Sequence, residues 1–263
     1  GMGGFASGPG GIAAWLLRVP LLIHEQNAIA GLTNKLLAPL AVSVMTAFPG
    51  VFKETDKVTI TGNPVRSDII NLSKPKERHI NSDAKLIKVL ALGGSLGAKA
   101  LNDVIPKSLI ALAADYKVEV KHQCGKKHYE VMRTAYDNSK INSEVTSFID
   151  DMAEAYAWAD VVVCRAGALT IAELTASGVA SILIPFPSAV DDHQTANGNY
   201  LTTEGAAILI QEAQFTVDKL KEVLLQLINT PECLLEMAIR ARSLAKPKAT
   251  KLVANICMET THV

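Results

Sequence analysis

The chain has 263 residues, of which 49% are hydrophobic and 5% aromatic, and its 26 basic residues are balanced by 26 acidic ones. A chain of this length holds one large domain or two ordinary ones with a mostly aliphatic core, and its neutral charge argues against sequence-independent binding of nucleic acid. The longest apolar runs have the length of a strand, well below the roughly 20 residues of a membrane-spanning helix.

A glycine-dense stretch opens the chain over residues 1–11 and has the character of a functional loop. Such a loop usually follows a strand that positions it, and none precedes this one, so we expect a protein that is truncated at its amino terminus. A helix over residues 12–17 and a short buried strand over residues 20–23 are predicted next. The polar residues 24–27 (His-Glu-Gln-Asn) then lie at the carboxyl edge of a sheet, where open α/β folds keep their ligands.

A break in the pattern near residue 66 indicates a domain boundary. We expect a helix over residues 31–37 and strands over residues 42–47 and 58–61. Asn63 then precedes a proline, which disfavours helix at that point, and the chain beyond it is polar and mixed in charge. We place the boundary at about Arg66.

Beyond the boundary, apolar strands alternate regularly with amphipathic helices. Strands that lack an alternating pattern and are separated by helices predict a parallel sheet covered on both faces. The expected strands are 88–92, 118–123, 145–149, 161–164, 181–186 and 206–210. The expected helices are 98–113, 129–136, 150–158, one beginning at 168, 193–203, 216–228, 231–244 and 250–258.

The turn from the apolar run 161–164 into the helix that begins at Ala168 is the strongest candidate for a binding site. A short β-branched run, Gly167 and a helix start leave several backbone N–H groups unpaired at one spot, which carries partial positive charge and favours a phosphate. Glu173, about one and a half turns further along, is placed to accept two hydrogen bonds from a ribose diol. We therefore predict that a nucleotide diphosphate binds here; the alternative is a plain strand-to-helix turn with a solvent-facing Glu173.

A second glycine-rich turn, residues 93–97 (Gly-Gly-Ser-Leu-Gly), lies between a predicted strand and a predicted helix, as a phosphate-binding turn would. An NAD site would also need an acid at the carboxyl end of the next strand. Glu119 has roughly the right spacing but stands at the beginning of that strand, which disfavours an NAD-dependent oxidoreductase. The turn also lacks the lysine of a Walker motif, which disfavours an ATPase.

Other polar residues have both a functional and a structural interpretation. Arg66, after a rigid Asn-Pro-Val segment, is suited to bidentate contact with phosphate, or it is a solvated linker residue. Gln194 and Asn197 share one helix face, which suits sugar hydroxyls, while Asp191 or Asp192 fits the cap of that helix. Neither the acidic pairs nor the four cysteines have metal-ligand spacing, so we expect no bound metal and reduced thiols.

Six short motifs occur in order along the chain and together closely resemble the MurG family of bacterial glycosyltransferases. They are residues 24–27 (HEQN), 62–66 (GNPVR), 93–98 (GGSLGA), 148–152 (FIDDM), 167–170 (GALT) and 192–197 (DHQTAN). The resemblance covers essentially the whole chain. Members of this family transfer N-acetylglucosamine from UDP-N-acetylglucosamine (UDP-GlcNAc) to lipid I, the undecaprenyl-pyrophosphoryl muramoyl-pentapeptide, and so form lipid II.

The resemblance implies the GT-B fold, an α/β architecture of two Rossmann-like parallel-sheet domains facing a cleft, with the first domain incomplete. Residues 1–66 would be the carboxyl-terminal part of the acceptor (lipid I) domain. Residues 67–245 would form the complete donor domain, which binds UDP-GlcNAc, and residues 246–263 a helix that crosses back to the first domain. The missing part of the acceptor domain would include another glycine-rich loop with a favoured catalytic-base histidine.

On the donor side, the resemblance assigns roles residue by residue. The backbone of Ile149 would hold uracil, Glu173 would bind the ribose hydroxyls, and Ser95 and Arg66 would reach phosphate. The residues that line the nucleotide and its diphosphate would be Ala168, Leu169, Thr170, Ile171 and Ala172.

Around the transferred sugar, Gln194 and Asn27 would touch the N-acetylglucosamine. His24 or Glu25 would assist deprotonation of the acceptor hydroxyl; the alternative for His24 is that it only orders the loop. The opening glycine loop would face the lipid pyrophosphate. The acceptor-side residues would be Gly3, Gly4, Gly10, Gly11 and Asn34.

The implied reaction is a displacement with inversion that uses no cofactor and no metal, in peptidoglycan synthesis. The implied partners are UDP-GlcNAc, lipid I and the membrane surface, and not nucleic acid. The implied location is cytoplasmic, peripheral on the cytoplasmic face of the bacterial inner membrane, with Trp15 either dipping into that surface or buried. For a truncated chain we expect donor binding with impaired catalysis; the alternatives are a noncatalytic UDP-sugar-binding module and an NAD-dependent oxidoreductase.

Overall fold

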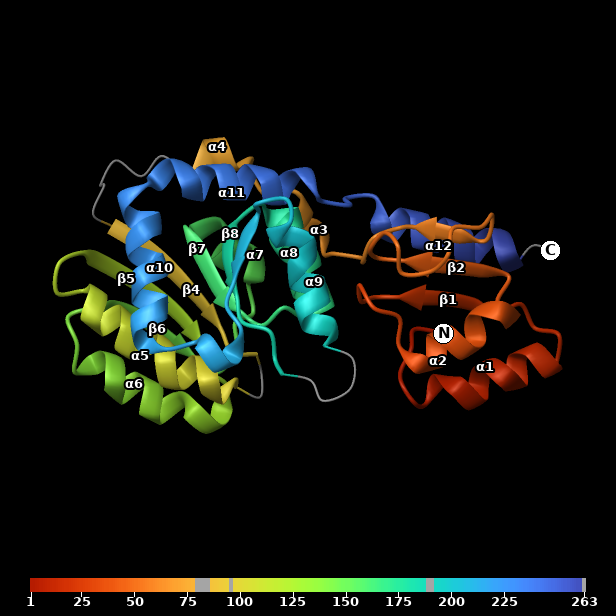
Figure 1. The fold of residues 1–263 in the computed structure, drawn as a ribbon, viewed down its shortest axis with the longest axis horizontal. Helices are drawn as coiled ribbons and strands as arrows, with labels where there is room; N and C mark the ends of the chain where they lie inside the picture. Colours follow the sequence, from red (N-terminus) through yellow and green to blue (C-terminus); the bar gives the residue numbers. More distant parts are fainter. Residues whose placement is uncertain (79–85, 95–96, 188–191, 262–263) are drawn as a thin grey trace.

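The computed structural model describes residues 1–78, 86–94, 97–187 and 192–261 of the chain. Within these residues there are two parallel sheets, one of three strands and one of six, toward opposite ends of an elongated molecule (Figure 1). The predicted α/β class with two separate parallel sheets is confirmed.

The first sheet is small and lies in the amino-terminal part of the chain, together with the helices that precede and connect its strands. Its elements are α1 (Ser7–Leu16), β1 (Leu22–Glu25), α2 (Leu32–Leu37), η1 (Ala38–Leu40), β2 (Ser43–Thr46) and β3 (Val58–Ile60). The strand order is β1-β2-β3, and Glu25 at the end of β1 pairs with Thr46 at the end of β2. Ile23, Leu37 and Val44 are buried together in the core of this unit.

Helix α1 begins at Ser7, so the prediction of a glycine loop that extends to residue 11 was wrong. Gly10 and Gly11 are helical, and a Cβ atom at Gly11 would lie 2.6 Å from Cδ1 of Leu37. Glycine at this position therefore allows α1 to approach α2 closely. Gly3 and Gly4, with φ of +79° and +80°, do lie in the loop before the helix.

The second sheet has the strand order β6-β5-β4-β7-β8-β9, and every neighbouring pair is parallel. The strands are β4 (Leu86–Leu92), β5 (Lys117–Gln123), β6 (Asn142–Thr146), β7 (Val161–Cys164), β8 (Ala180–Leu183) and β9 (Ala207–Leu209). β7 and β8 are buried along their whole length, as continuous apolar strands of a covered parallel sheet should be. The order of strands reverses between β4 and β7, and sheets of this kind bind ligands outside the carboxyl ends of the strands at that point.

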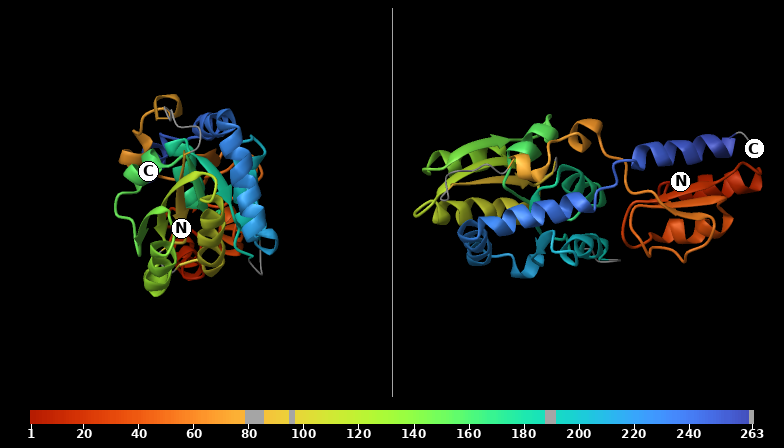
Figure 2. Two further views of the ribbon diagram at one scale, coloured as in Figure 1. Left: turned by 90° about the vertical axis from the view of Figure 1, so that its left-hand side faces the viewer. Right: turned by 90° about the horizontal axis from the view of Figure 1, so that it is seen from above.

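Helices cover both faces of the second sheet (Figure 2). They are α5 (Lys99–Leu112), α6 (Tyr129–Asp137), α7 (Met152–Trp158), α8 (Ala168–Ser177), α9 (His193–Thr202), α10 (Val217–Asn229) and α11 (Pro231–Ser243), with short turns η2 (Lys126–His128) and η3 (Glu212–Gln214). One buried cluster contains Leu101 of α5 and Leu224 of α10. The other contains Tyr156 of α7 and Leu174 of α8. The sheet therefore has an apolar core on each face.

Two strands of the second sheet end three residues earlier than predicted. β6 ends at Thr146 and β8 at Leu183. β6 lies at the edge of the sheet and begins with polar residues, so its sequence has only a weak apolar pattern. The predicted bounds of this strand were therefore too close to the carboxyl terminus. Ile149 and Phe186 consequently lie in loops beyond the carboxyl ends of the strands.

Two connections link the sheets. One carries the short helices α3 (Ser67–Ile70) and α4 (Pro75–Arg78), and the other leads from α11 to α12 (Ala249–Thr261). α12 is far from β2 in the sequence but lies beside the first sheet (Figures 1 and 2). In the described parts of the chain, no helix combines the length and the apolarity that crossing a membrane requires.

Candidate functional site

The turn between β7 and α8 lies where the strand order of the second sheet reverses. Gly167 occupies the N-cap of α8 with an extended backbone, and no side chain caps the helix there. The first turn of α8 contains no acidic residue. Its amide groups therefore keep the partial positive charge that favours an anion. Leu169 in this turn is 53% exposed, so the turn is open at the surface.

Glu173 lies in the second turn of the same helix and is partly buried. Its Oε2 atom accepts a hydrogen bond of 2.9 Å from the hydroxyl of Tyr156, which is fully buried in α7. Burial raises the pKa of the Glu173 carboxyl group, while the Tyr156 hydrogen bond and the charge of Arg66 act in the opposite direction. Arg66 is exposed at the start of α3. The structure thus brings Glu173 and Arg66, predicted to bind ribose and phosphate, into one region.

The glycine turn after β4 is held against the end of β5. Gly97 has φ of +76°, and a Cβ atom there would lie 2.3 Å from the carbonyl oxygen of Cys124. The N–H of Gly93 donates to the carbonyl of Gln123 at 2.9 Å. Both conformation and space therefore require glycine at position 97. Ser95, predicted to reach phosphate, lies outside the described residues.

A buried chain of hydrogen bonds supports this turn. His122 of β5 lies 3.1 Å from Oδ1 of Asn102 through Nε2 and 3.0 Å from the hydroxyl of Tyr136 through Nδ1. Because Oδ1 of Asn102 is an acceptor, Nε2 carries the hydrogen and Nδ1 accepts from Tyr136. Asn102 in turn donates through Nδ2 to the carbonyl of Cys124 at 3.1 Å. Burial lowers the pKa of His122 to about 4, so the imidazole is neutral near pH 7.

A cavity of about 590 Å³ opens at the carboxyl edge of the second sheet. Gln194 of α9 is fixed there, because its Oε1 atom accepts a hydrogen bond of 2.9 Å from the N–H of Phe186. Arg165, directly after β7, forms an ion pair with Glu212. The residues that line the cavity include Gly93, Gly97, Arg165, Phe186, Gln194 and Glu212. The cavity therefore joins the glycine turn, the end of β7 and the start of α9.

The loop after β1 is organised around the carboxylate of Glu25, which is 4% exposed. Its Oε1 atom accepts from the N–H and Nδ2 of Asn27 at 3.0 and 3.4 Å. Its Oε2 atom accepts from the N–H of Gly31 and from Nδ2 of Asn34 at 3.0 and 2.8 Å. Asn34 is itself buried beneath Gly3, where a Cβ atom would lie 3.2 Å from Nδ2. Glu25 thus holds the loop together, and two predicted acceptor-side residues lie against each other.

His24 connects the end of β1 to the linker. It is 3% exposed, and its Nε2 atom donates to the carbonyl of Gly62 at 3.1 Å. Its Nδ1 atom is buried and has no hydrogen-bond partner among the described residues. Burial lowers the pKa of His24, and the hydrogen bond to Gly62 and the charge of Glu25 partly offset that effect. This geometry supports the alternative that His24 orders the loop, and a catalytic role of His24 stays a prediction.

Two asparagines join the loop after β1 to the second unit. Asn63 donates through Nδ2 to the carbonyls of Gln26 and Ala168 at 3.0 and 3.3 Å. Asn197 of α9 donates through Nδ2 to Oδ1 of Asn27 at 3.1 Å. Asn197 is fully buried, so the interpretation that it faces sugar hydroxyls was wrong. These bonds bring the predicted acceptor loop against the amino terminus of α8.

The other predicted donor residues differ in exposure. Ile149 is half-buried in the loop before α7. Ile171 is 1% exposed, and its N–H already donates to the carbonyl of Gly167 at 2.9 Å. Asp192 stands at the N-cap of α9 in a left-handed conformation, but its side chain makes no capping hydrogen bond, contrary to the prediction for that position. Asp191 lies outside the described residues.

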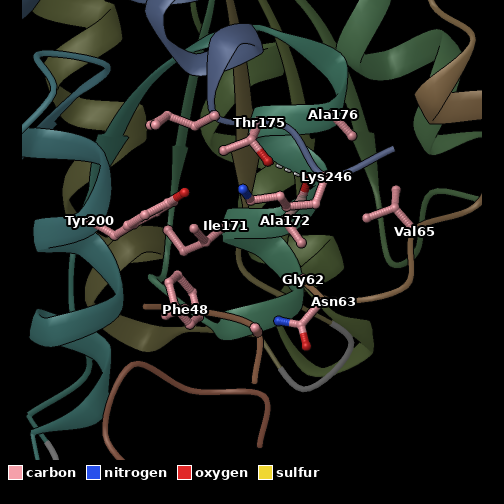
Figure 3. Close-up of a pocket in the computed structure, with 12 residues that line it drawn as sticks. Phe48, Gly62, Asn63, Val65, Ile171, Ala172, Thr175, Ala176, Tyr200 and Lys246 are labelled. Carbon is pink, nitrogen blue, oxygen red and sulfur yellow. Dashed lines mark hydrogen bonds between the residues drawn. The ribbon is translucent and has the colours of Figure 1, made fainter. Parts of the chain in front are cut away.

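A narrow pocket lies between the linkers that join the two units (Figure 3). Phe48 and Tyr200 pack edge to face at its rim, with ring centroids 5.1 Å apart. Ala172 of α8 and Lys246 of the second linker also line it. Its volume of about 20 Å³ is close to that of one water molecule. This pocket is therefore a small gap between the linkers. The larger cavity at the sheet edge is lined by Gln194, predicted to contact the sugar, but not by Arg66, by residues 168–172 or by Glu173.

No pattern in the sequence indicates the contacts of Tyr156 or Arg165 or the cross-links made by Asn63. Asn63 lies within the motif of residues 62–66, so the sequence indicated that this position matters, but it did not indicate which residues Asn63 contacts. Tyr156 lies on an ordinary amphipathic helix and carried no local signal. Its role depends on a contact with Glu173, 17 positions later in the chain.

Comparisons with known proteins agree with this arrangement. The model of the family described as "Glycosyltransferase family 28 C-terminal domain" matches residues 88–253, and that of the corresponding N-terminal domain matches residues 1–46. The UDP-N-acetylglucosamine--N-acetylmuramyl-(pentapeptide) pyrophosphoryl-undecaprenol N-acetylglucosamine transferase of Marinobacter nauticus is 49% identical over 262 residues, 100% of this chain and 72% of that protein. The protein of the same name from Azotobacter vinelandii is 50% identical with the same coverage. This chain belongs to the MurG family.

A solved structure supports the same conclusion. The crystal structure of MurG from Acinetobacter baumannii has a TM-score of 0.87 and 42% sequence identity over 98% of this chain and 72% of that chain. Membership of the MurG family confirms the predicted resemblance, the GT-B architecture and the class of UDP-GlcNAc-dependent glycosyltransferases.

Proposed function

We propose that this chain binds UDP-GlcNAc at the carboxyl edge of its second sheet and serves the transfer of N-acetylglucosamine to the C4 hydroxyl of the muramoyl sugar of lipid I, giving lipid II. The observation that carries the proposal is the convergence of the uncapped amino terminus of α8, Glu173 and Arg66 in a chain 49% identical to an enzyme named for that transfer. Residues 67–245 would form the donor domain, residues 1–66 the acceptor side and residues 246–263 the returning helix.

The proposed donor contacts follow from the chemistry of the residues. The amides at residues 168–170 and the Arg66 guanidinium suit the diphosphate, and Glu173 suits the ribose hydroxyls. Ile149 would hold uracil through its backbone, and Ser95 would reach phosphate. Ile171 and Ala172 would only pack beneath the nucleotide and line its site. Gln194 and Asn27 would contact the sugar.

In the proposed reaction, the C4 hydroxyl oxygen of the acceptor attacks the anomeric carbon, and the bond from that carbon to the UDP oxygen breaks with inversion. The hydroxyl proton passes to a general base. Amide groups of α8 and the Arg66 cation stabilise the negative charge that develops on UDP. Deprotonation assisted by His24 or Glu25 stays a prediction; the contacts of both side chains support a role in holding the loop.

The acceptor would be presented at a membrane surface. Phe5, Leu16, Leu32 and Leu36 are 95%, 67%, 69% and 67% exposed, and an apolar groove of about 650 Å³ lies between α1 and α2. Trp15 is 49% exposed, which supports the surface interpretation of this residue. A peripheral position on the cytoplasmic face of the inner membrane accounts for such an apolar surface in an enzyme that uses a lipid-linked acceptor. Leu16→Glu with Leu36→Glu should then reduce co-sedimentation with phosphatidylglycerol vesicles, and unchanged binding would reject this part of the proposal.

Calorimetric titration with UDP tests the donor site. Glu173→Ala should weaken UDP binding by about 1–3 kcal/mol, because ribose hydroxyls would lose their buried partner. Glu130→Ala, an exposed change on α6, is the matched control and should bind UDP like the parent chain. Equal affinity in Glu173→Ala and the parent would reject the ribose assignment.

The chain aligns with 72% of the length of these relatives. For the 263 residues assayed alone, we propose donor binding with impaired transfer. Supplying the amino-terminal segment of a relative in trans separates the enzyme from a noncatalytic UDP-sugar-binding module. Restored transfer supports the enzyme, whereas unchanged binding without transfer supports the module. Preference for NAD over UDP in a competition titration would support an oxidoreductase instead.

A further inference from the structure

Tyr156 is a fully buried tyrosine whose hydroxyl group reaches the edge of the candidate nucleotide site. Its ring lies in the core between α7 and α8, and its hydroxyl donates to Oε2 of Glu173 at 2.9 Å. A tyrosine ring has two side-chain torsions, and packing in a core restricts both. The hydroxyl is therefore a fixed donor.

The backbone around Tyr156 is fixed as well. The guanidinium of Arg78 donates to the carbonyl of Tyr156 at 3.2 Å and to the carbonyl of Gly178 at 2.6 Å, and it also contacts the carbonyl of Ser177. One cation thus ties α7 to the carboxyl-terminal end of α8. This link sets the spacing between the two helices that carry Tyr156 and Glu173.

Glu173 needs such support if it is to bind a ribose. A glutamate side chain has three torsions, and fixing it costs rotamer entropy. An ionised carboxylate offers about four lone-pair positions. With one position of Oε2 taken by Tyr156, the carboxylate is held in one orientation, and the remaining positions can accept from two neighbouring hydroxyls.

We propose that Tyr156 is a positioning residue that orients Glu173 toward the nucleotide ribose and thereby sets the preference of this site for ribose over 2′-deoxyribose. The inference rests on the proposed function, because it assumes that the ribose of UDP lies at Glu173. Tyr156 itself would not touch the ligand and would act only through the carboxylate of Glu173.

The test is the ratio of two dissociation constants, for 2′-deoxy-UDP and for UDP, measured by calorimetry. In Tyr156→Phe, we expect the Kd for UDP to rise by about threefold to tenfold, the scale of one hydrogen bond. The Kd for 2′-deoxy-UDP should change much less, so the ratio should fall. In Glu173→Gln the ratio should fall too, and adding Tyr156→Phe to Glu173→Ala should change UDP binding no further.

The matched control is Tyr136→Phe. Tyr136 is also buried in this unit, and its hydroxyl bonds to His122 rather than to Glu173. Its removal should leave the ratio of the two constants unchanged. Thermal unfolding of each variant checks that the comparison is made on folded protein. If Tyr156→Phe does not fold, a crystal structure of the parent chain with UDP supplies the test, because Oε2 of Glu173 should keep its hydrogen bond to Tyr156 while the carboxylate accepts from the ribose hydroxyls, and a carboxylate turned away from Tyr156 in that complex would overturn the positioning role.

The outcomes separate this inference from the proposed function. If Glu173→Ala does not weaken UDP binding, the ribose assignment itself fails. A second outcome is that Glu173→Ala weakens UDP binding, but Tyr156→Phe raises both dissociation constants by the same factor or leaves both unchanged. In that case the positioning role of Tyr156 is overturned, while the proposed function stands. A ratio that falls in Tyr156→Phe and stays constant in Tyr136→Phe supports the inference.

Discussion

Asn197 of α9 and Asn27 of the loop after β1 form a hydrogen bond of 3.1 Å, although they are 170 positions apart in the chain and lie in the units of different sheets. The same Asn197 side chain accepts the N–H of Ala28 at 2.8 Å and donates to the carbonyl of Ala166 at 3.2 Å. Its amide is fully buried, so these partners replace water completely. This side chain therefore links the loop after β1 to the end of β7.

Replacing this residue should destabilise the whole chain. Asn197→Ala removes three hydrogen bonds and leaves the Ala28 N–H without its partner, so we expect a loss of about 1–3 kcal/mol in the free energy of unfolding. Urea unfolding followed by circular dichroism measures it. Asn199→Ala, an exposed position on the same helix, is the control. If both variants unfold at the same urea concentration, Asn197 does not join the two units.

The carboxylate of Glu25 should be required for loop structure. Glu25→Gln replaces one acceptor oxygen by an NH₂ group, which would face the donors of Asn27 or of Gly31 and Asn34. We expect a loss of about 1–3 kcal/mol in stability, because a buried donor is left unsatisfied. Glu54→Gln, at an exposed site, should be neutral in the same thermal unfolding experiment. Unchanged stability of Glu25→Gln, together with lost transfer, would instead favour a direct catalytic role.

How far the sequence predicted the structure depended on whether the signal was local. The bounds of β7 and the start of α8 at Ala168 were predicted correctly, because a continuous apolar run followed by a glycine is unambiguous. The edge strand β6 was displaced, since half-exposed polar residues carry little periodic signal. Asn197 was interpreted as a sugar contact, because nothing near it in the sequence shows that its partners lie in the loop after β1.

The same limit applies to the candidate site. Glu173 was singled out from its distance to a helix start, which is a local relationship. The hydrogen bond from Tyr156 and the buried chain from Tyr136 through His122 to Asn102 are tertiary contacts. Only folding places them beneath α8 and the glycine turn, so no sequence pattern marks them.

Protonation of His122 should destabilise the fold at acidic pH. Burial lowers the pKa of this imidazole from 6.5 to about 4. The unfolded chain therefore binds a proton near pH 6.5 that the folded chain does not bind until about pH 4. The contribution of His122 to the free energy of unfolding is therefore fully present above pH 6.5. It is lost as the pH drops from 6.5 to 4, by about 3 kcal/mol in total.

His122→Gln tests this linkage, because glutamine does not titrate in the window. The difference in unfolding free energy between the parent and His122→Gln should shrink as the pH falls from 7 to 4. Asn199→Ala, an exposed change on α9 that adds or removes no titratable group, should keep the pH dependence of the parent. Parallel curves for the parent and His122→Gln would contradict the prediction.

Gly62 should be essential where the two linkers cross. Its φ is +82°, and a Cβ atom there would lie 2.5 Å from Cβ of Lys246. Gly62→Ala therefore combines backbone strain with a clash between linkers, whereas Gly50→Ala has strain alone, because Gly50 has φ of +73° and nothing within 4 Å. We expect about 1–3 kcal/mol of destabilisation from strain in both variants and about 1–3 kcal/mol more from overpacking in Gly62→Ala. Adding Lys246→Gly, which removes the clashing carbon, should recover the second part. Equal unfolding midpoints for Gly62→Ala and Gly50→Ala would show that the linkers move apart without cost.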